Sequence, residues 1–446
     1  MNTPGNITCY NEEFARVADQ LPGADLDWLC EHRHRAMAQF DSVGFPTVRN
    51  EEWKYTDLTK LAEQTFRVTT KSAPPSVSDL LAGASLREAD EKETDELVFI
   101  NGVYDANLSD RVDLIAGVTV QSLAETLKTA PAGLAALFDN DHNGECTALN
   151  SAFAHEGAYI ELADNIDLHK PVHLLFVASE EDVNLAQFPR IVISLGKNSS
   201  AQVIETYIGN AKTCNFTNTI THIHTAPGAQ LEHYKFQEET DDAFHIGRVD
   251  ATLSRDSSLK SFSISLGAQL ARHDLAIKLN APGARVELLG LYMGDGRQHV
   301  DHHTRIDHLT PHTISLENYR GILDGHARGV FNGKVVVHPA AQNIDAQQSN
   351  KNLLFSDYAE VDTKPELEIY ADDVTCAHGA TVGQLDKDAF FYLLSRGVDR
   401  DTARGLLTYA FAGEIVEQIS LAPLRQHLTQ SIIGHLSDAE RLRGFL

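Results

Sequence analysis

The sequence predicts a mainly β protein whose core is a parallel β-helix or a related β-solenoid, with a helical (α/β) region before it and a helical region after it. Strand-like runs recur from about residue 158 to residue 383, where long helical patterns are missing. A faint repeat marks short strands and tight turns through the same stretch. Helical spacing of apolar residues predominates on both sides of it.

The repeat consists of small or polar pairs that each precede a strand-like run, namely Ser199-Ser200, Gly228-Ala229, Ser257-Ser258 and Gly283-Ala284. The second residues of these pairs are 29, 29 and 26 positions apart, and a further step of 29 reaches Thr313. One coil of this length cannot bury its inward side chains alone, so stacked coils would build a continuous core. A β-sandwich with evenly spaced strands is the competing interpretation.

The N-terminal region is expected to combine helices with a little β structure. Apolar residues three and four positions apart, from Phe14 to Leu21, predict a helix, and a second helix follows it. Trp53 lies in a run of charged residues, and we expect this segment to anchor the helical arm on the body. Asn101-Gly102 separates two strand-like runs and therefore predicts a β-hairpin.

We accordingly divide the chain into three regions: an N-terminal helical/α-β region over 1–150, a parallel β-helix core over 151–384 and a C-terminal helical region over 385–446. In the last region, helices are expected over 390–394, 399–418 and 424–436. Gly397 and Pro423 separate them. Because open coil ends are sheet edges, the flanking regions could act as caps or as docking arms.

Charge and hydropathy exclude several partners. The chain has 63 acidic and 37 basic residues, a formal net charge of −26, which argues against nucleic acid or an anionic membrane surface as a partner. No apolar run is long enough to span a bilayer. The first residues lack the basic and apolar parts of a secretory signal, so a cytoplasmic location is expected.

Cysteine spacing and glycine patterns exclude several kinds of site. The five cysteines are scattered and no C-x-x-C occurs, so neither a disulfide framework nor a complete zinc or cluster motif is present. No phosphate-binding loop or dinucleotide-binding fingerprint occurs either. If the process needs ATP, another subunit must therefore bind it.

The strongest candidate site is the pair Cys376 and His378, where a strand leads into a helix. Residues i and i+2 of a strand share one face, so this thiol and imidazole could approach one metal ion or one partner together. The alternative, slightly favoured by the pattern alone, is a buried small thiol beside a hydrogen-bonded imidazole. No Cys–His–Asn context indicates a nucleophile.

A second candidate is the densest histidine cluster, which contains His299, His302, His303 and His308. Such a cluster could bind zinc or ferrous iron, and it would suit a stand-alone metal-binding β-helix protein. The spacing favours the simpler interpretation, a polar strand and turn that carry surface imidazoles. A less favoured alternative is a β-helix carbohydrate-active enzyme that uses carboxylates on its concave face.

Four segments are distinctive: 50–56 (NEEWKYT), 329–334 (GVFNGK), 348–354 (QSNKNLL) and 359–383 (AEVDTKPELEIYADDVTCAHGATVG). On these segments the chain resembles the SufB/SufD family of iron–sulfur cluster assembly proteins in the SUF system, and most closely its SufD members. The resemblance covers the chain from about residue 45 to its end and is strongest over 315–420. The run from 359 to 383 is long and specific, and its last part, from His378 to Gly383, points to the SufD members.

The resemblance implies a right-handed parallel β-helix with helical flanks. It also implies pairing with SufB through the β-helix ends and docking of the SufC ATPase on the C-terminal helical region. We expect that surface within 385–420, with Phe390, Phe391, Leu394 and Arg396 as its candidates. By match of motif, His378 corresponds to the histidine that SufD members offer at the SufB interface, and Cys376 corresponds to the neighbouring thiol.

The leading hypothesis is thus a non-catalytic scaffold subunit of a SufBCD complex with a role in iron entry and nascent cluster formation. SufB would complete the ligand set at His378 and Cys376, so iron or a nascent cluster would be shared and nothing would be bound stably by this chain alone. The sulfur would come from a cysteine desulfurase, an indirect partner. In isolation the open coil end could also pair with a second copy as a homodimer.

Overall fold

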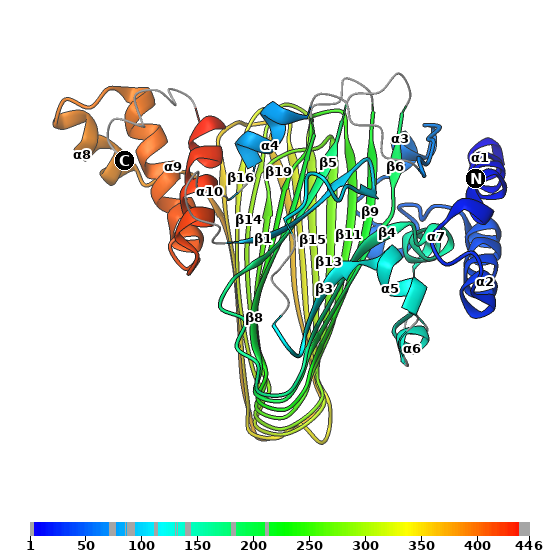
Figure 1. Cartoon of the computed structure of the whole chain (residues 1–446). Coiled ribbons are helices and arrows are strands. Elements are labelled where there is room, and N and C mark those ends of the chain that lie inside the picture. The colour runs from blue at the N-terminus through cyan, green and yellow to red at the C-terminus, as the bar shows by residue number, and fades with distance from the viewer. Residues whose placement is uncertain are drawn as a thin grey trace.

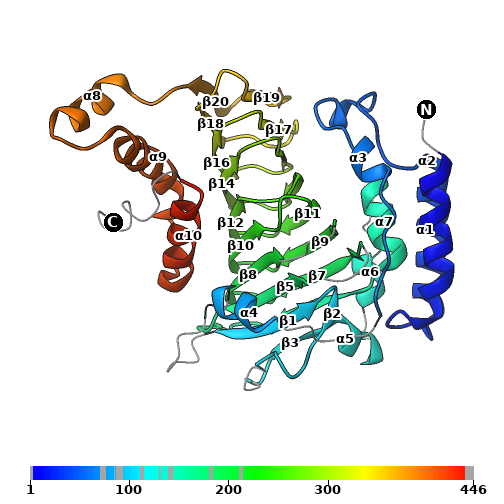
Figure 2. The ribbon, with the colours of Figure 1, turned by 90° about the horizontal axis from the view of Figure 1, so that it is seen from above.

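The computed structural model describes residues 4–70, 77–84, 86, 94–110, 115–129, 131, 133–138, 144–179, 184–209 and 214–436. Two ten-stranded sheets run side by side along a long, narrow body (Figure 1). Helices flank the body on both sides, with most of the N-terminal helices beside one sheet and the C-terminal helices beside the other (Figure 2). No helix in these ranges is long and apolar enough to cross a membrane.

Strands alternate between the sheets as the chain winds. The first sheet contains, in spatial order, β2 (Val103–Tyr104), β1 (Asp95–Ile100), β5 (Val172–Ala178), β8 (Ser200–Gly209), β10 (Gln230–Glu238), β12 (Ser258–Ser265), β14 (Arg285–Gly294), β16 (Ile314–Leu323), β18 (Ile344–Leu354) and β20 (Val374–Gly383). The second contains β19 (Glu360–Ile369), β17 (Arg328–Val337), β15 (His299–His308), β13 (Leu270–Leu279), β11 (Phe244–Leu253), β9 (Phe216–Thr225), β7 (Pro189–Leu195), β4 (Glu156–Leu162) and β3 (Val118–Ser122), while the short β6 (Ala186–Gln187) pairs with β9.

The predicted parallel β-helix is confirmed. Each strand from β7 to β20 pairs in parallel with the strand two positions along the chain, which is the pattern of a solenoid and not of a sandwich. The predicted small or polar pairs lie at the turns into one sheet, because β8, β10, β12, β14 and β16 begin at or directly after them. One repeat therefore corresponds to one coil of two strands.

The interior of the β-helix carries an apolar core along much of its length, built from inward-facing residues of both sheets. Three aromatic rings stack on successive strands of the first sheet, with centroid distances of 4.6 Å from Phe99 to Phe176 and 4.8 Å from Phe176 to Tyr207. Elsewhere the interior is polar. Glu205 is fully buried and accepts hydrogen bonds from Tyr207 at 2.7 Å and Thr221 at 2.6 Å, with His233 at 2.9 Å.

The N-terminal helices and short helical turns are α1 (Pro4–Val17), η1 (Ala18–Gln20), α2 (Asp27–Val43), η2 (Glu51–Trp53), α3 (Thr59–Ala62), α4 (Ser78–Ala84), α5 (Leu123–Thr129), α6 (Leu134–Phe138) and α7 (Glu145–Phe153). Residues of α1, α2 and α7 share an apolar cluster with Phe188, Phe216 and Phe244 of the second sheet or its edge. The predicted hairpin is also confirmed, since β1 and β2 pair across Asn101-Gly102.

The three predicted C-terminal helices are α8 (Lys387–Ser395), α9 (Arg400–Val416) and α10 (Ala422–Gly434). Asp386 and Asp399 cap α8 and α9 by accepting backbone N–H groups from their first turns. Apolar residues of α9 and α10 pack on the outward side of the first sheet, among them Ile415 and Leu428 against a cluster that includes Phe236. In contrast, no side chain of α8 is buried.

Candidate functional site

The last coil of the β-helix, β19 and β20, is open on one side. Each strand is the terminal strand of its sheet, in register with β17 and β18 on its inner side (Figure 2). All of β19 and β20 is at least partly exposed, whereas β16 and β17 one or two coils earlier are mostly buried. The outer edges of the last coil therefore offer unpaired backbone N–H and C=O groups to a further strand.

The structure places Cys376 and His378 together on the inward face of this open coil. They pair in register with Ala346 and Gln348 of β18, both buried and inward-facing, and paired residues on neighbouring parallel strands point the same way. Cys376 is half-buried and packs beside Ala346, and this burial raises the pKa of its thiol. His378 is exposed. Their roles in binding remain predictions.

Exposed apolar side chains gather around the same coil. Nine large apolar side chains are exposed in the part of the chain that the structure describes, and six of them lie within 358–392: Tyr358, Ile369, Tyr370, Val382, Phe391 and Tyr392. The first four border or belong to β19 and β20, and the last two lie on α8. We call these six residues the apolar rim. Exposed apolar patches of this kind are typical of binding surfaces.

The four candidates for partner docking lie on or next to α8. Phe391 is 71% exposed, while Phe390 and Leu394 are half-buried. Arg396, the residue at the C-terminal cap of the helix, places its guanidinium 5.1 Å from the Tyr392 ring centroid. α8 contacts α9 and extends away from the body beyond β20 (Figure 2). This helix thus presents a solvated aromatic surface.

The histidine cluster is divided between the two faces of β15. His302 and His308 point into the β-helix, where burial lowers the pKa of each imidazole to about 4. His302 stacks on Tyr292 with ring centroids 5.3 Å apart, and His308 contacts the hydroxyls of Thr313 and Ser315. The favoured expectation of surface imidazoles is therefore wrong for these two residues, because stacked coils and flanking segments cover both faces of the strand.

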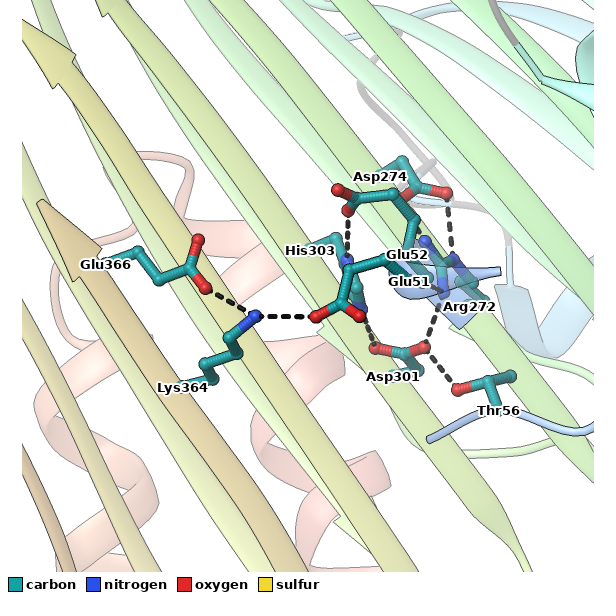
Figure 3. A network of polar contacts seen from close by, with 9 residues as sticks. All are labelled: Glu51, Glu52, Thr56, Arg272, Asp274, Asp301, His303, Lys364 and Glu366. Carbon is teal, nitrogen blue, oxygen red and sulfur yellow. Dashed lines mark hydrogen bonds and ion pairs between the residues drawn. The ribbon is translucent and has the colours of Figure 1, made fainter. Parts of the chain in front are cut away.

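His299 and His303 point outward, into contacts with residues 50–56, the NEEWKYT segment. His303 is buried and lies 3.0 Å from Asp301 and 3.6 Å from Glu52 (Figure 3). Although burial opposes the charge, Asp301 raises the pKa of His303 to about 9. His299 lies 2.9 Å from the Thr56 hydroxyl. Since the four histidines face opposite ways, they do not converge on one ion.

Asp301 is the centre of this outward network. Its fully buried carboxylate lies 3.0 Å from Arg272 and accepts a hydrogen bond of 2.5 Å from Thr56. Against the effect of burial, His303 and Arg272 hold the pKa of Asp301 well below its usual range. Trp53 lies on the Arg272 guanidinium at 3.8 Å, which confirms the predicted anchoring of the helical arm.

Arg272 and Asp301 are absent from the residues predicted from the sequence. The only available signal was local: Asp301 and His303 are two positions apart, as are Arg272 and Asp274, so each pair shares one strand face. Arg272 binds Asp274 at 2.8 Å, and Lys364 of β19 reaches Glu51 at 3.2 Å (Figure 3). The network therefore fastens the NEEWKYT segment to the second sheet as far as the open coil.

Among the described residues, no three His, Cys, Asp or Glu side chains gather as a group that could hold a metal ion. Cys376 and His378 by themselves would supply two ligands at most. Soft thiolate and imidazole ligands suit iron and iron–sulfur clusters, but a cluster iron usually needs more of them than this pair supplies.

Comparison with known proteins matches residues 6–174 to the N-terminal region of SufBD proteins and residues 176–411 to the SufBD core domain of SUF-system iron–sulfur cluster assembly. An iron–sulfur cluster assembly SufBD family protein of Synechocystis is 34% identical over 437 residues, 95% of each chain. The iron–sulfur cluster assembly protein SufD of Escherichia coli is 31% identical over 416 residues, 91% of this chain and 92% of that protein. SufD of Bacillus subtilis is 26% identical over 292 residues. The chain therefore belongs to the SufBD family of iron–sulfur cluster assembly proteins.

Proposed function

We propose that this chain is a non-catalytic scaffold subunit that joins a SufB-like β-helix end to end and carries the SufC ATPase on its C-terminal helices. ATP hydrolysis would then belong to SufC, and sulfur would reach the assembly from a cysteine desulfurase. Family membership supports a role in iron–sulfur cluster assembly. The pairing, the docking and the role in iron entry are inferred from the geometry of the open coil and of α8.

The observation that carries this proposal is the open last coil with its apolar rim. Two free strand edges can each pair with a strand of another chain, and the open end of a second β-helix would present two such edges. The rim residues Tyr358, Tyr370 and Val382 are 68%, 61% and 50% exposed. Packing against a partner would remove this apolar surface from water, which favours association at about 25 cal/mol per Å² of apolar surface buried.

The proposed chemistry lies at the centre of the same interface. His378 and Cys376 share the inward face of β20, so a partner coil placed on β20 would cover both. Thiolates from the partner would complete the coordination of the cargo, which is iron or a nascent cluster. A shared ligand set also explains why this chain alone would hold nothing stably.

The docking surface for SufC is assigned to α8. No side chain of this helix is buried, although it carries Phe390, Phe391 and Leu394. An amphipathic helix that leaves its aromatic residues in water is suited to insertion into a groove of a partner. Arg396 and the exposed Phe391 are residue types that often dominate binding energy at interfaces.

The chemical part is tested by purifying the tagged chain with SufB-like and SufC-like partners, followed by anaerobic reconstitution and an ultraviolet–visible spectrum. We expect His378→Ala to form the complex but gain less cluster absorbance than the parent. His169→Ala is the matched control, because the His169 side chain is 86% exposed and lies far along the chain from β20. Equal absorbance for His378→Ala and the parent would remove His378 from the site.

The pairing part is tested separately with a charge placed on the rim. Val382→Glu should weaken binding of the SufB-like partner at least tenfold in analytical ultracentrifugation, because a carboxylate would be desolvated at the interface. Ile115→Glu is the control, since Ile115 and Val382 are both 50% exposed and Ile115 lies just before β3, at the other end of the β-helix. If both variants bind alike, the open coil is not the interface.

A further inference from the structure

A row of three polar side chains leads from the interior of the β-helix to His378. Glu317 of β16, Gln348 of β18 and His378 of β20 are paired in register on successive strands of one sheet. Neighbouring strands lie about 4.8 Å apart, and residues paired in this way share one face. Glu317 and Gln348 are both 4% exposed, while His378 is exposed at the opening.

Gln348 is held in a fixed orientation. Its Nε2 donates a hydrogen bond of 2.8 Å to Oε2 of Glu317. On the opposite sheet, a Cβ added to Gly333 would lie 1.8 Å from this Nε2, so the glycine leaves the space that the amide occupies. Burial raises the pKa of Glu317 to about 7, so above that pH its carboxylate determines which end of the amide faces it, since a carboxylate accepts and only the NH₂ end donates.

The other end of the amide has no partner. Among the described residues, Oε1 of Gln348 is buried and accepts no hydrogen bond. An unsatisfied buried acceptor costs about 1–3 kcal/mol unless something donates to it. On the open side, the residue paired in register with Gln348 is His378, and its imidazole carries an N–H that can donate a hydrogen bond.

We propose that Gln348, oriented by Glu317, is the positioning residue for His378. Its Oε1 accepts the N–H of the imidazole, which fixes one tautomer and leaves the other ring nitrogen as a lone pair for the cargo. Metal-binding histidines usually donate their second N–H in this way, and loss of the acceptor typically lowers metal affinity about 10–100-fold. The inference rests on the proposed function of His378 and adds the residue that orients it.

The first test reads the tautomer of His378 in the isolated chain, without any partner. Nitrogen-15 NMR of histidine-labelled protein reports which ring nitrogen carries the proton, and a His378→Gln sample identifies the signal. A hydrogen bond of ordinary strength should shift the tautomer ratio about fivefold from that of a free histidine side chain in water. In Gln348→Met the ratio should return to the free value, and in Gln347→Met, which changes the exposed neighbour, it should not move.

Glu317→Leu provides a second variant in case Gln348→Met fails to fold. Without its acceptor the amide of Gln348 is free to turn, so the tautomer preference of His378 should fall while Gln348 itself is retained. A ratio in the parent chain equal to that of a free histidine side chain would overturn the proposal. So would a parent ratio that persists in both Gln348→Met and Glu317→Leu.

The second test asks whether the positioning matters for the cargo. In the complex with SufB-like and SufC-like partners, Gln348→Met should lower iron retention about tenfold, and Gln348→Met/His378→Ala should be no worse than His378→Ala alone. If His378→Ala assembles clusters normally, the proposed function fails while the tautomer result still stands. If His378→Ala is defective but Gln348→Met is not, the positioning role fails.

Discussion

Asp301→Ala should detach the NEEWKYT segment from the second sheet. The carboxylate of Asp301 lies 3.0 Å from both Arg272 and His303 and accepts the Thr56 hydroxyl at 2.5 Å, with no exposure of its own side chain. Its removal leaves two buried cations that face each other without the anion between them. Breaking a buried pair in this way typically costs 3–5 kcal/mol.

The lower end of that range applies here, because both cations keep another partner. Arg272 retains Asp274 at 2.8 Å and donates to the backbone carbonyl of Glu52 at 2.6 Å, and His303 retains the Glu52 carboxylate at 3.6 Å. We therefore expect a loss of about 3 kcal/mol, which corresponds to a change of about 150-fold in an opening equilibrium.

Hydrogen exchange of the amides in this segment is the appropriate assay, because local detachment need not unfold the whole chain. The amides of Trp53 and Thr56 are hydrogen-bonded to backbone carbonyls at 2.9 and 3.0 Å and should exchange up to about 150-fold faster. Asp250→Ala is the control, since the Arg248–Asp250 pair has the same spacing but is partly exposed and worth at most about 1 kcal/mol. Unchanged exchange in Asp301→Ala would refute the reasoning.

Three further predictions concern pH, docking and packing. Because the folded-state pKa of His303 is raised to about 9, its contribution to stability is fully present below about pH 6.5 and is lost as the pH rises through 9; urea unfolding of the parent, but not of His303→Gln, should show this loss. Phe391→Ala should weaken SufC binding at least tenfold in titration calorimetry and leave the unfolding midpoint unchanged, because this ring is 71% exposed; a shifted midpoint would instead indicate a packing role. Gly290→Ala should destabilise the chain by about 1–3 kcal/mol, because the new Cβ would lie 2.0 Å from the Tyr319 ring, whereas Gly379→Ala meets open space; equal denaturant midpoints for both variants would contradict this packing.

The repeat predicted the fold well because β-helix geometry is local. Each coil must turn at a fixed interval, so small or polar residues recur where β8, β10 and β12 begin. The C-terminal helices were predictable for a similar reason, since the apolar spacing and the capping residues, such as Asp399, are local features of each helix's own sequence.

The surroundings of the site were less predictable. In a β-helix with covered flanks, both faces of a strand can be buried, so the sequence of β15 does not reveal that His302 points inward and His303 outward. The contact of Thr56 with Asp301 joins positions 245 residues apart, and no local pattern encodes it. Likewise, the unpartnered oxygen of Gln348 becomes visible only when its neighbours in register are known.

The two ends of the β-helix differ in a way that limits how such chains assemble. At the N-terminal end, the short β2 and β3 run antiparallel to β1 and β4, whereas β19 and β20 keep the parallel order to the last coil. A β-helix with only one open end can pair end to end with only one partner. Pairing of two such β-helices through their open ends would leave no open end for a third, so this geometry favours a discrete pair over a filament.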